Sequence, residues 1–319
     1  MARRRVQRHI TRDPRRPLHA DDAKADDHPR GLPTSSATLP SLVVRMFQHA
    51  RLTDGDELLD LGTGSGYGTA LATHRLGERR VVSVDVDPGL VIAARDRLAE
   101  INQRPTVVVA DATKSLPGEY DAIVATVGLR PIHTSVLAAL KPGGRLVTTI
   151  AGTSLLVTAQ KDEDGGATGR VEWDRAGFMR TRHEDDYPPG LDELLDTARE
   201  HDGDDVTRSP YPVVDVANAW DLHSMLDVTA PDIEHHYEET DEQRVALMAH
   251  ADGSWTRATA RGDEPATVHQ GGPRRLWDIL DELRGYWLTN GELPVRGAHV
   301  WIKPDGTTWL ARGKWHVKV

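Results

Sequence analysis

Cysteine is absent from this chain, and phenylalanine occurs only twice in its 319 residues. Without thiols the protein forms no disulfide, no thiolate metal site and no cysteine nucleophile. No stretch approaches the roughly 18 consecutive apolar residues that a membrane-spanning helix requires, and the N-terminal arginines are not followed by the apolar segment of a secretory signal. We therefore expect a globular protein that works in the cytoplasm and has no membrane partner.

Positive charge is in deficit as well. The chain has 39 Lys and Arg against 49 Asp and Glu, so its formal net charge at pH 7 is −10. A surface of this sign repels phosphate backbones, and we expect no nucleic-acid partner. The charge is uneven, because residues 1–17 contain seven arginines and one aspartate, whereas residues 184–205 contain ten acidic residues and one arginine. We expect the basic leader, residues 1–30, to be disordered; a clamp for an acidic peptide is the alternative.

From residue 39 onward the chain alternates between strand and helix patterns. Apolar residues at helical spacing predict a short amphipathic helix around residues 42–47, and the βαβ alternation starts after it. We predict helices at 69–76, 88–101 and 132–140, and strands at 57–61, 80–86, 106–110, 121–126, 145–150, 155–160 and 169–173. This spacing predicts an α/β fold with a parallel, doubly wound sheet, which the last two strands are expected to complete.

The composition changes in the second half, where seven of the eight tryptophans lie beyond residue 200. A helix is predicted at 274–288, followed by short strands around the hairpin-type turn Lys303-Pro304-Asp305-Gly306. We expect most of these tryptophans to fill a small core. The predicted organisation is the leader at 1–30, a first domain at 31–185, an acidic linker at 186–205, and a second, smaller α+β domain at 206–319.

A glycine-rich turn follows the first strand. Gly62-Thr63-Gly64-Ser65-Gly66 has glycine at alternate positions, which differs from the G-x-G-x-x-G spacing of nicotinamide enzymes. The chain has to turn sharply here and bring its backbone against a ligand, and only glycine lacks the Cβ that would obstruct both. The N–H groups at the start of the next helix suit a carboxylate, such as that of a methionine moiety.

Three aspartates stand at the ends of three successive predicted strands. Asp85 comes 25 residues after Asp60, where an acid accepts hydrogen bonds from both hydroxyls of a ribose. Asp111 precedes Ala112, in a position to accept a hydrogen bond from the exocyclic amine of an adenine. The alternative is that these acids only cap helices and form turns. Together with the glycine turn they predict a cofactor site, because an open sheet binds its ligand at these strand ends.

These motifs, together with Tyr120-Asp121 and residues 140–146, resemble a class I methyltransferase, and more narrowly the protein-L-isoaspartate O-methyltransferase family. The narrowing feature is Ser36-Ala37-Thr38, which stands 24 residues before Asp60, with Thr38 in place of the family's usual proline. The resemblance covers residues 31–182. It implies a Rossmann-like fold, S-adenosyl-L-methionine as cofactor with S-adenosyl-L-homocysteine as product, and no metal. It assigns the cofactor to Asp60, Gly62, Thr63, Gly64, Ser65, Gly66, Asp85, Val86, Asp111, Ala112, Thr126 and Thr181.

The departures from the family point to one branch of it. The Arg-rich leader replaces an N-terminal helical region, and residues 34–43 resemble a Thr-Ser-Ser-x-x-x-Pro-Ser-Leu version of the upstream segment. That version is typical of actinobacterial relatives that modify ribosomally synthesised peptides. Those relatives carry a tryptophan-containing C-terminal region with a late turn similar to Pro304-Asp305-Gly306-Thr307 and Trp309. The second domain would then recognise a peptide substrate.

The resemblance implies an aspartyl or isoaspartyl carboxylate as the acceptor. A carboxylate of pKa about 3.9 is already ionised at pH 7, so the enzyme needs no strong general base, and alignment with removal of water remains the task. Candidate catalytic groups are Thr34, Ser35 and Ser36, which would orient the acceptor, and Thr126 in a predicted loop, 126–128, that lines the transfer site. Ser36 as a simple helix cap is the alternative.

Several functions remain open at this point. The first is methylation of an aspartate in a macrocyclic, ribosomally synthesised peptide, after which the ester closes to an aspartimide. This aspartimide is either the product or hydrolyses to isoaspartate. The second is general isoaspartyl repair, and the third is a non-catalytic cofactor-binding recognition module. A methyltransferase for a small molecule or RNA is a fourth, with RNA disfavoured by the net charge. We expect the protein to be a monomer whose partner is an Asp- or isoAsp-containing peptide.

Overall fold

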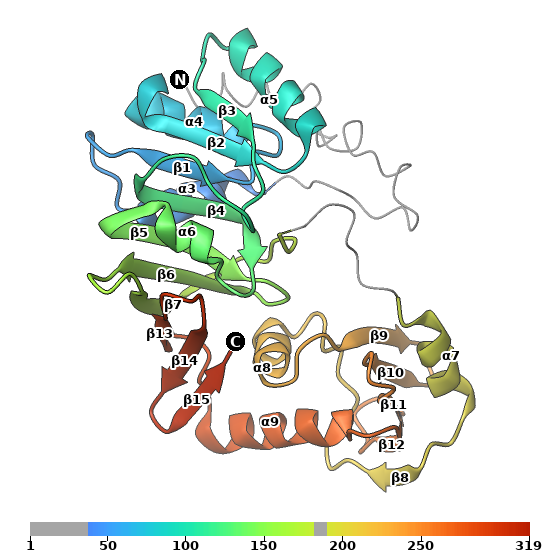
Figure 1. Ribbon diagram of the computed structural model, residues 1–319. Coiled ribbons are helices and arrows are strands. Elements are labelled where there is room, and N and C mark those ends of the chain that lie inside the picture. Colours follow the sequence, from blue (N-terminus) through green and yellow to red (C-terminus); the bar gives the residue numbers. More distant parts are fainter. Residues whose placement is uncertain (1–37, 182–189) are drawn as a thin grey trace.

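The computed structural model describes residues 38–181 and 190–319, which form two β-sheets with helices packed against them (Figure 1). The predicted leader and the first residues of the predicted linker lie outside these ranges. Ten strands form the larger sheet, in the order β15-β14-β13-β7-β6-β5-β4-β1-β2-β3. Five strands form the smaller sheet, in the order β8-β12-β11-β10-β9. The predicted α/β fold class is confirmed.

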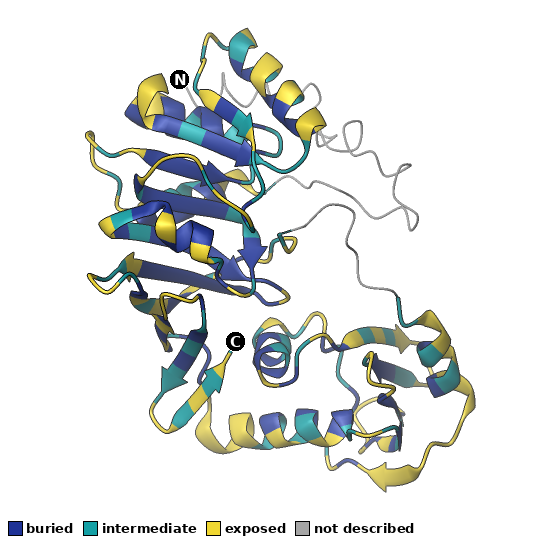
Figure 2. Ribbon diagram, viewed as in Figure 1, coloured by how far each residue is buried: buried dark blue, intermediate teal, exposed yellow. Residues whose placement is uncertain are grey.

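The centre of the larger sheet is parallel. Its strands are β1 (Leu58–Leu61), β2 (Val81–Asp85), β3 (Thr106–Val109), β4 (Tyr120–Leu129) and β5 (Leu140–Ile150). All four residues of β1 are buried, as expected for a strand with helices on both of its faces (Figure 2). The chain order along this part of the sheet reverses between β1 and β4, which makes their carboxyl ends the topological switch point.

Helices cover both faces of this parallel region. They are α3 (Pro40–Ala50), α4 (Tyr67–Leu76), α5 (Pro88–Glu100) and α6 (Thr134–Ala138). Met46 of α3 and Ala72 of α4 pack with Leu58 on one face, and Val136 of α6 packs with Leu59 on the other. Local sequence explains the start of α5, because the Asp87 carboxylate accepts hydrogen bonds from the backbone N–H of Gly89 and Leu90, with Pro88 at the first helical position.

The larger sheet continues beyond the two strands that the sequence assigned to its end. β6 (Leu155–Lys161) and β7 (Ala167–Arg175) add antiparallel, and then β13 (His299–Ile302), β14 (Thr308–Arg312) and β15 (Trp315–Lys318) follow. The expectation that β6 and β7 complete the sheet is therefore wrong. Unpaired N–H and C=O groups on β7 would form an open edge, and the C-terminal strand β13 pairs with them.

The second unit contains β8 (Asp205–Arg208), β9 (Glu234–Glu239), β10 (Arg244–Ala249), β11 (Trp255–Ala260) and β12 (Thr267–Gly271), with α7 (Asp192–Glu200), α8 (Trp220–Thr229) and α9 (Leu276–Asn290). Helix α7 lies inside the segment that the sequence assigned to a linker. Its Leu195 and Ala198 are buried against Leu247 and Trp255 of the small sheet. Acidic residues lie on the outer side of α7, and only a few apolar residues pack against the sheet. The apolar periodicity that would predict this helix is therefore weak in the sequence.

The two sheets share a continuous apolar core. It includes Leu59 of β1, Leu226 of α8 and the fully buried Trp277 of α9. Fewer of the seven tryptophans beyond residue 200 fill a core than expected, since Trp255 and Trp277 are buried, Trp309 and Trp315 are half-buried, and Trp220, Trp287 and Trp301 are exposed. Among the described residues, no helix has the length and apolar character needed to cross a membrane.

Candidate functional site

The glycine turn leaves β1 at the switch point. Gly62, Gly64 and Gly66 all have positive φ, at 96°, 48° and 81°, in the region that side chains with a Cβ rarely adopt. Space is also limiting at Gly62, where a Cβ would stand 2.9 Å from Val127 Cγ1 and 3.1 Å from Thr126 Oγ1. The first glycine is therefore needed for backbone conformation and for the close approach of β4.

Hydrogen bonds hold this turn in one shape. The backbone N–H groups of Gly62 and Thr63 donate to the carbonyl of Val84, at 2.9 and 3.1 Å, and the N–H of Gly66 donates to the carbonyl of Thr63 at 2.8 Å. The Thr126 hydroxyl donates to the carbonyl of Gly62 at 2.9 Å. The turn is thus tied to β2 on one side and to β4 on the other.

Asp60 lies beneath the turn rather than in the cavity beside it. Its side chain is 1% exposed, and its carboxylate accepts hydrogen bonds from Thr69 Oγ1 at 2.6 Å and Ser83 Oγ at 2.9 Å. Burial raises the pKa of Asp60 to about 6, although both hydroxyls oppose the shift. The Thr63 hydroxyl also turns inward, to Ser83 Oγ at 2.6 Å. These contacts hold the strand, turn and helix together below the ligand-facing surface.

Asp85 ends β2 beside the turn. Its Oδ2 accepts a hydrogen bond from the backbone N–H of Gly64 at 2.9 Å, and its Oδ1 accepts one from the N–H of Asp87 at 3.2 Å. The carboxylate is thereby fixed at the edge of the sheet, next to the glycine that approaches it.

A cavity opens at this edge, with about 700 Å³ of space including its open mouth. Its lining comes from the ends of β1, β2 and β4 and from the residues around the end of β3. Thr38, Leu90 of α5 and residues 179–181 complete it. The lining residues are Thr38, Leu61, Gly62, Gly64, Asp85, Val86, Leu90, Ala110, Ala112, Thr126, Val127, Met179, Arg180 and Thr181.

The structure therefore gathers seven of the sequence-predicted cofactor residues around one cavity: Gly62, Gly64, Asp85, Val86, Ala112, Thr126 and Thr181. Asp60, Thr63, Ser65, Gly66 and Asp111 are not among the residues that line it. Asp111 has the local turn contact that the sequence left open as an alternative, since its Oδ1 accepts hydrogen bonds from the N–H and hydroxyl of Thr113, at 2.8 and 2.7 Å. Its neighbours Ala110 and Ala112 face the cavity instead.

Residues 179–181 reach the cavity because they pair with β4. The N–H of Gly128 donates to the carbonyl of Met179 at 2.7 Å, and the N–H of Thr181 donates to the carbonyl of Gly128 at 2.9 Å. Residues 126–128 are consequently part of β4, and their assignment to a loop is wrong. The Thr181 hydroxyl lies 3.2 Å from Nε2 of His133, whose pKa is lowered by burial. The sequence pointed to Thr181 but missed Met179 and Arg180, which follow no recognisable motif.

The predicted orienting hydroxyls Thr34, Ser35 and Ser36 lie outside the described residues. Thr38, where the described chain begins, is part of the cavity lining.

Two ion pairs join the second unit to the first, and one of them involves Arg180 of the cavity lining. Arg180 Nη2 lies 3.0 Å from Asp232 Oδ1, in the turn between α8 and β9. Arg130, just after β4, donates to the Asp227 carboxylate of α8 and, at 3.2 Å, to the carbonyl of the same residue. Burial raises the pKa of Asp227, although the Arg130 guanidinium opposes the shift.

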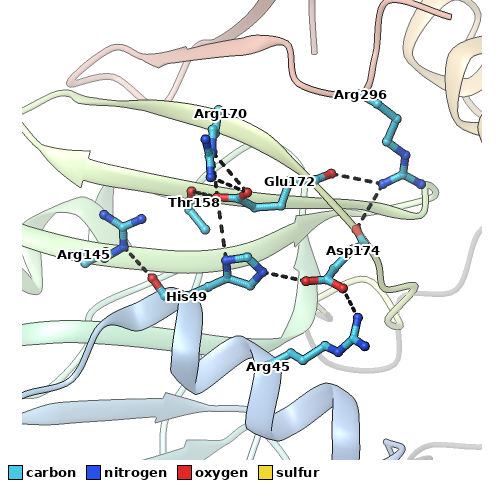
Figure 3. A network of polar contacts seen from close by, with 8 residues as sticks. All are labelled: Arg45, His49, Arg145, Thr158, Arg170, Glu172, Asp174 and Arg296. Atoms are coloured by element: carbon cyan, nitrogen blue, oxygen red, sulfur yellow. Dashed lines mark hydrogen bonds and ion pairs between the residues drawn. The ribbon is translucent and has the colours of Figure 1, made fainter. Parts of the chain in front are cut away.

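A separate polar cluster ties α3 to β6, β7 and the segment before β13 (Figure 3). Glu172 accepts hydrogen bonds from Thr158 Oγ1 at 2.6 Å and Arg170 Nε at 3.0 Å, and these contacts lower its pKa although burial alone would raise it. His49 Nε2 lies 2.8 Å from Asp174, and Arg296 donates to the carbonyl of Asp174 at 3.1 Å. None of these residues lines the cavity, so the cluster stabilises the joint between the sheet and its C-terminal extension.

The first half of the chain is similar to known proteins. A family model described as Protein-L-isoaspartate(D-aspartate) O-methyltransferase matches residues 26–174. The chain is similar to the protein-L-isoaspartate O-methyltransferase of Ignicoccus hospitalis, with 35% identity over 35% of this chain and 54% of the relative. It is also similar to protein-L-isoaspartate O-methyltransferase 1 of Syntrophobacter fumaroxidans, with 34% identity over 46% of this chain and 71% of the relative.

The aligned segment thus spans little more than half the length of the Ignicoccus protein. A solved structure named protein-L-isoaspartate O-methyltransferase has 17% sequence identity to this chain and a TM-score of 0.47, and the alignment covers 89% of this chain and 82% of that one. Most of the second unit lies beyond the residues that the family model matches.

Proposed function

This chain belongs to the protein-L-isoaspartate O-methyltransferase family, and from that premise we propose that it transfers a methyl group from S-adenosyl-L-methionine to an aspartyl or isoaspartyl carboxylate of a peptide. The observation that carries this proposal is the cavity at the switch point, where the glycine turn and Asp85 meet. Ligands of open α/β sheets bind at this position.

The residues around the cavity fit the proposed cofactor. Gly62 and Gly64 present bare backbone to the cavity, and the Asp85 carboxylate is available at the strand end to accept hydrogen bonds from ribose hydroxyls. Leu90 and Ala112 provide apolar surface for an adenine. When bound, S-adenosyl-L-methionine supplies an electrophilic methyl group on a sulfonium. The chain's part is to hold the acceptor carboxylate in line with that methyl group and to exclude water from it.

The acceptor requires no proton transfer, because an aspartyl carboxylate with pKa about 3.9 is ionised at neutral pH. We assign its orientation to hydroxyl and backbone groups at the cavity mouth. Thr38 and Thr181 line the cavity, and the proposed donors Thr34, Ser35 and Ser36 come two to four residues before Thr38 in the chain. Thr126 has a different role in this scheme, since its hydroxyl already donates to Gly62 and shapes the turn.

Isotope transfer tests this function. The full chain is incubated with methyl-labelled S-adenosyl-L-methionine and either an isoaspartyl peptide or its aspartyl isomer, and base-labile label in the peptide is counted. We expect base-labile methyl ester on at least one isomer. Cofactor binding by calorimetry with no transfer to either peptide, linear or cyclic, would instead favour a non-catalytic recognition module.

We propose further that the substrate is a selected peptide, such as a macrocyclic, ribosomally synthesised one that contains aspartate. The second unit supports this, because Asp232, in the turn after α8, contacts Arg180 of the cavity lining. After methylation, the backbone nitrogen of the next residue attacks the ester carbonyl, methanol leaves, and a five-membered aspartimide closes. Hydrolysis of the ring then yields isoaspartate.

General isoaspartyl repair is the alternative with the same methylation step. The two are separated by comparing kcat/KM for a linear isoaspartyl peptide with that for a macrocycle containing a normal aspartate, and mass spectrometry of the macrocycle reports the loss of water that marks the aspartimide. Turnover of the linear isoaspartyl peptide alone would remove the selected-peptide proposal and leave the carboxyl methyltransferase intact.

A further inference from the structure

Arg180 is the one arginine among the residues that line the cavity in the described part of the chain. Its backbone is held against Gly128 of β4 by the neighbouring hydrogen bonds of Met179 and Thr181. Its guanidinium points to the second unit, where Nη2 lies 3.0 Å from Asp232. A positive group of the cavity lining therefore lies where the second unit contacts the first.

The Arg180–Asp232 pair is exposed on both sides, with side-chain accessibilities of 47% and 60%. Exposed pairs of this kind contribute little to stability, because water and salt compete for both partners. The contact can therefore open without disturbing the fold. Asp232 also has a positive φ of 61° in its turn, so it is presented by a tight loop rather than by a packed element.

The Arg130–Asp227 pair differs from the Arg180–Asp232 pair in its burial. Arg130 and Asp227 are each only 12% exposed, and their contact closes the joint between the end of β4 and α8. Opening that pair would leave a buried charge without its partner, which is strongly unfavourable. Arg130 is thus held in a buried structural pair, whereas Arg180 forms an exposed pair whose partner can be exchanged.

We propose that Arg180 binds a second, non-reacting carboxylate of the peptide substrate, which displaces Asp232 from it. The inference rests on the proposed function. A guanidinium matches a carboxylate with two parallel hydrogen bonds, and the incoming acid reproduces the contact it replaces. Asp232 therefore competes with the acidic group of the substrate for Arg180, whereas a neutral peptide gains no contact with this guanidinium. Arg180 is accordingly a specificity-determining residue rather than a catalytic one.

Calorimetry with S-adenosyl-L-homocysteine present tests this without requiring turnover. The probes are a short isoaspartyl peptide flanked by glutamates and the same peptide flanked by glutamines. In the wild type we expect the glutamate peptide to bind more tightly. Arg180→Gln should weaken its binding about two- to fivefold, and Asp232→Asn should strengthen it by a similar factor, the range that an exposed ion pair supports. Neither change should alter the binding of the glutamine peptide.

The double variant Arg180→Gln/Asp232→Asn measures the energetic coupling between the two residues. If Asp232 acts only by occupying Arg180, Asp232→Asn adds nothing in the Arg180→Gln background. Arg199→Gln is the matched control, because Arg199 forms a comparably exposed pair with Asp196 on α7, outside the cavity lining. Its binding should equal that of the wild type.

Equal affinities of the wild type for the two peptides, or weaker binding by Asp232→Asn, would overturn the proposal. The second result is the one expected if the pair merely clamps the two units together. Methyl transfer by the wild type is measured separately on the same peptides. A failure of the methyltransferase function therefore shows as absent label, whereas a failure of the Arg180 proposal shows as lost preference between glutamate and glutamine peptides.

Discussion

Removing the Asp85 carboxylate tests the proposed cofactor site most directly. Asp85→Ala deletes the acceptor for the N–H of Gly64 and for the N–H of Asp87, and it deletes the proposed partner of the ribose. A hydrogen bond to a charged group contributes about 1.5–3 kcal/mol. We therefore expect the dissociation constant for S-adenosyl-L-methionine to rise by roughly 10- to 100-fold, since 1.4 kcal/mol corresponds to a factor of ten.

Asp85→Asn separates the two contributions. The amide oxygen can still accept from Gly64, so the shape of the turn is preserved while the charge is lost. We expect Asp85→Asn to retain the wild-type melting temperature and to show an intermediate loss of affinity by calorimetry. Affinity for the cofactor that is unchanged in both variants would refute the assignment of Asp85 to the ribose. An equal fall in melting temperature in both would instead indicate a purely structural carboxylate.

Three further predictions concern Gly62 of the glycine turn, the buried Asp60 and the Arg130–Asp227 pair. Gly62→Ala should abolish measurable cofactor binding and lower the melting temperature, because its Cβ would meet Val127 Cγ1 at 2.9 Å and its φ of 96° is strained for alanine; a variant that binds normally would contradict the close approach. Asp60 has a folded pKa of about 6, above the ordinary aspartate value of 3.8, so the folded state holds the proton more tightly and the wild type should lose stability as pH rises from about 4 to 6. In urea unfolding this loss amounts to about 3 kcal/mol relative to Asp60→Asn, which lacks the titration; parallel pH profiles would disprove it. Arg130→Ala should lower the free energy of unfolding by about 2–4 kcal/mol, since it leaves Asp227 buried without its partner, and Asp227→Asn in that background should restore part of the loss.

Much of the first sheet was predictable because its signals are local. The apolar run of β1, the glycine turn and the Asp87-Pro88 start of α5 each depend on contacts within a few residues. Such contacts follow from hydrophobic periodicity, positive φ and helix capping, all of which can be read from adjacent positions. The cavity lining that these elements supply could therefore be anticipated in part, as Gly62, Gly64 and Asp85 illustrate.

The direction in which a side chain points was harder to predict from the sequence. Asp60 and Asp85 both end up beside the turn, yet Asp60 points into the protein toward Thr69 and Ser83, while Asp85 lies at the cavity. The hydroxyls that hold Asp60 inward come from α4 and β2, whereas Asp85 is held by the backbone N–H groups of Gly64 and Asp87. The spacing of the two acids in the sequence does not report these partners.

By itself, then, the sequence determined the alternation of strands and helices, the conformation of the turn and the strand ends at which a ligand binds. Tertiary structure alone placed β13 against β7, put Arg180 in the lining of the cavity and brought Asp232 against it. The physical reason is separation along the chain. A strand about 130 residues away has no local signal for its partner, and it pairs where the folded sheet leaves an open edge.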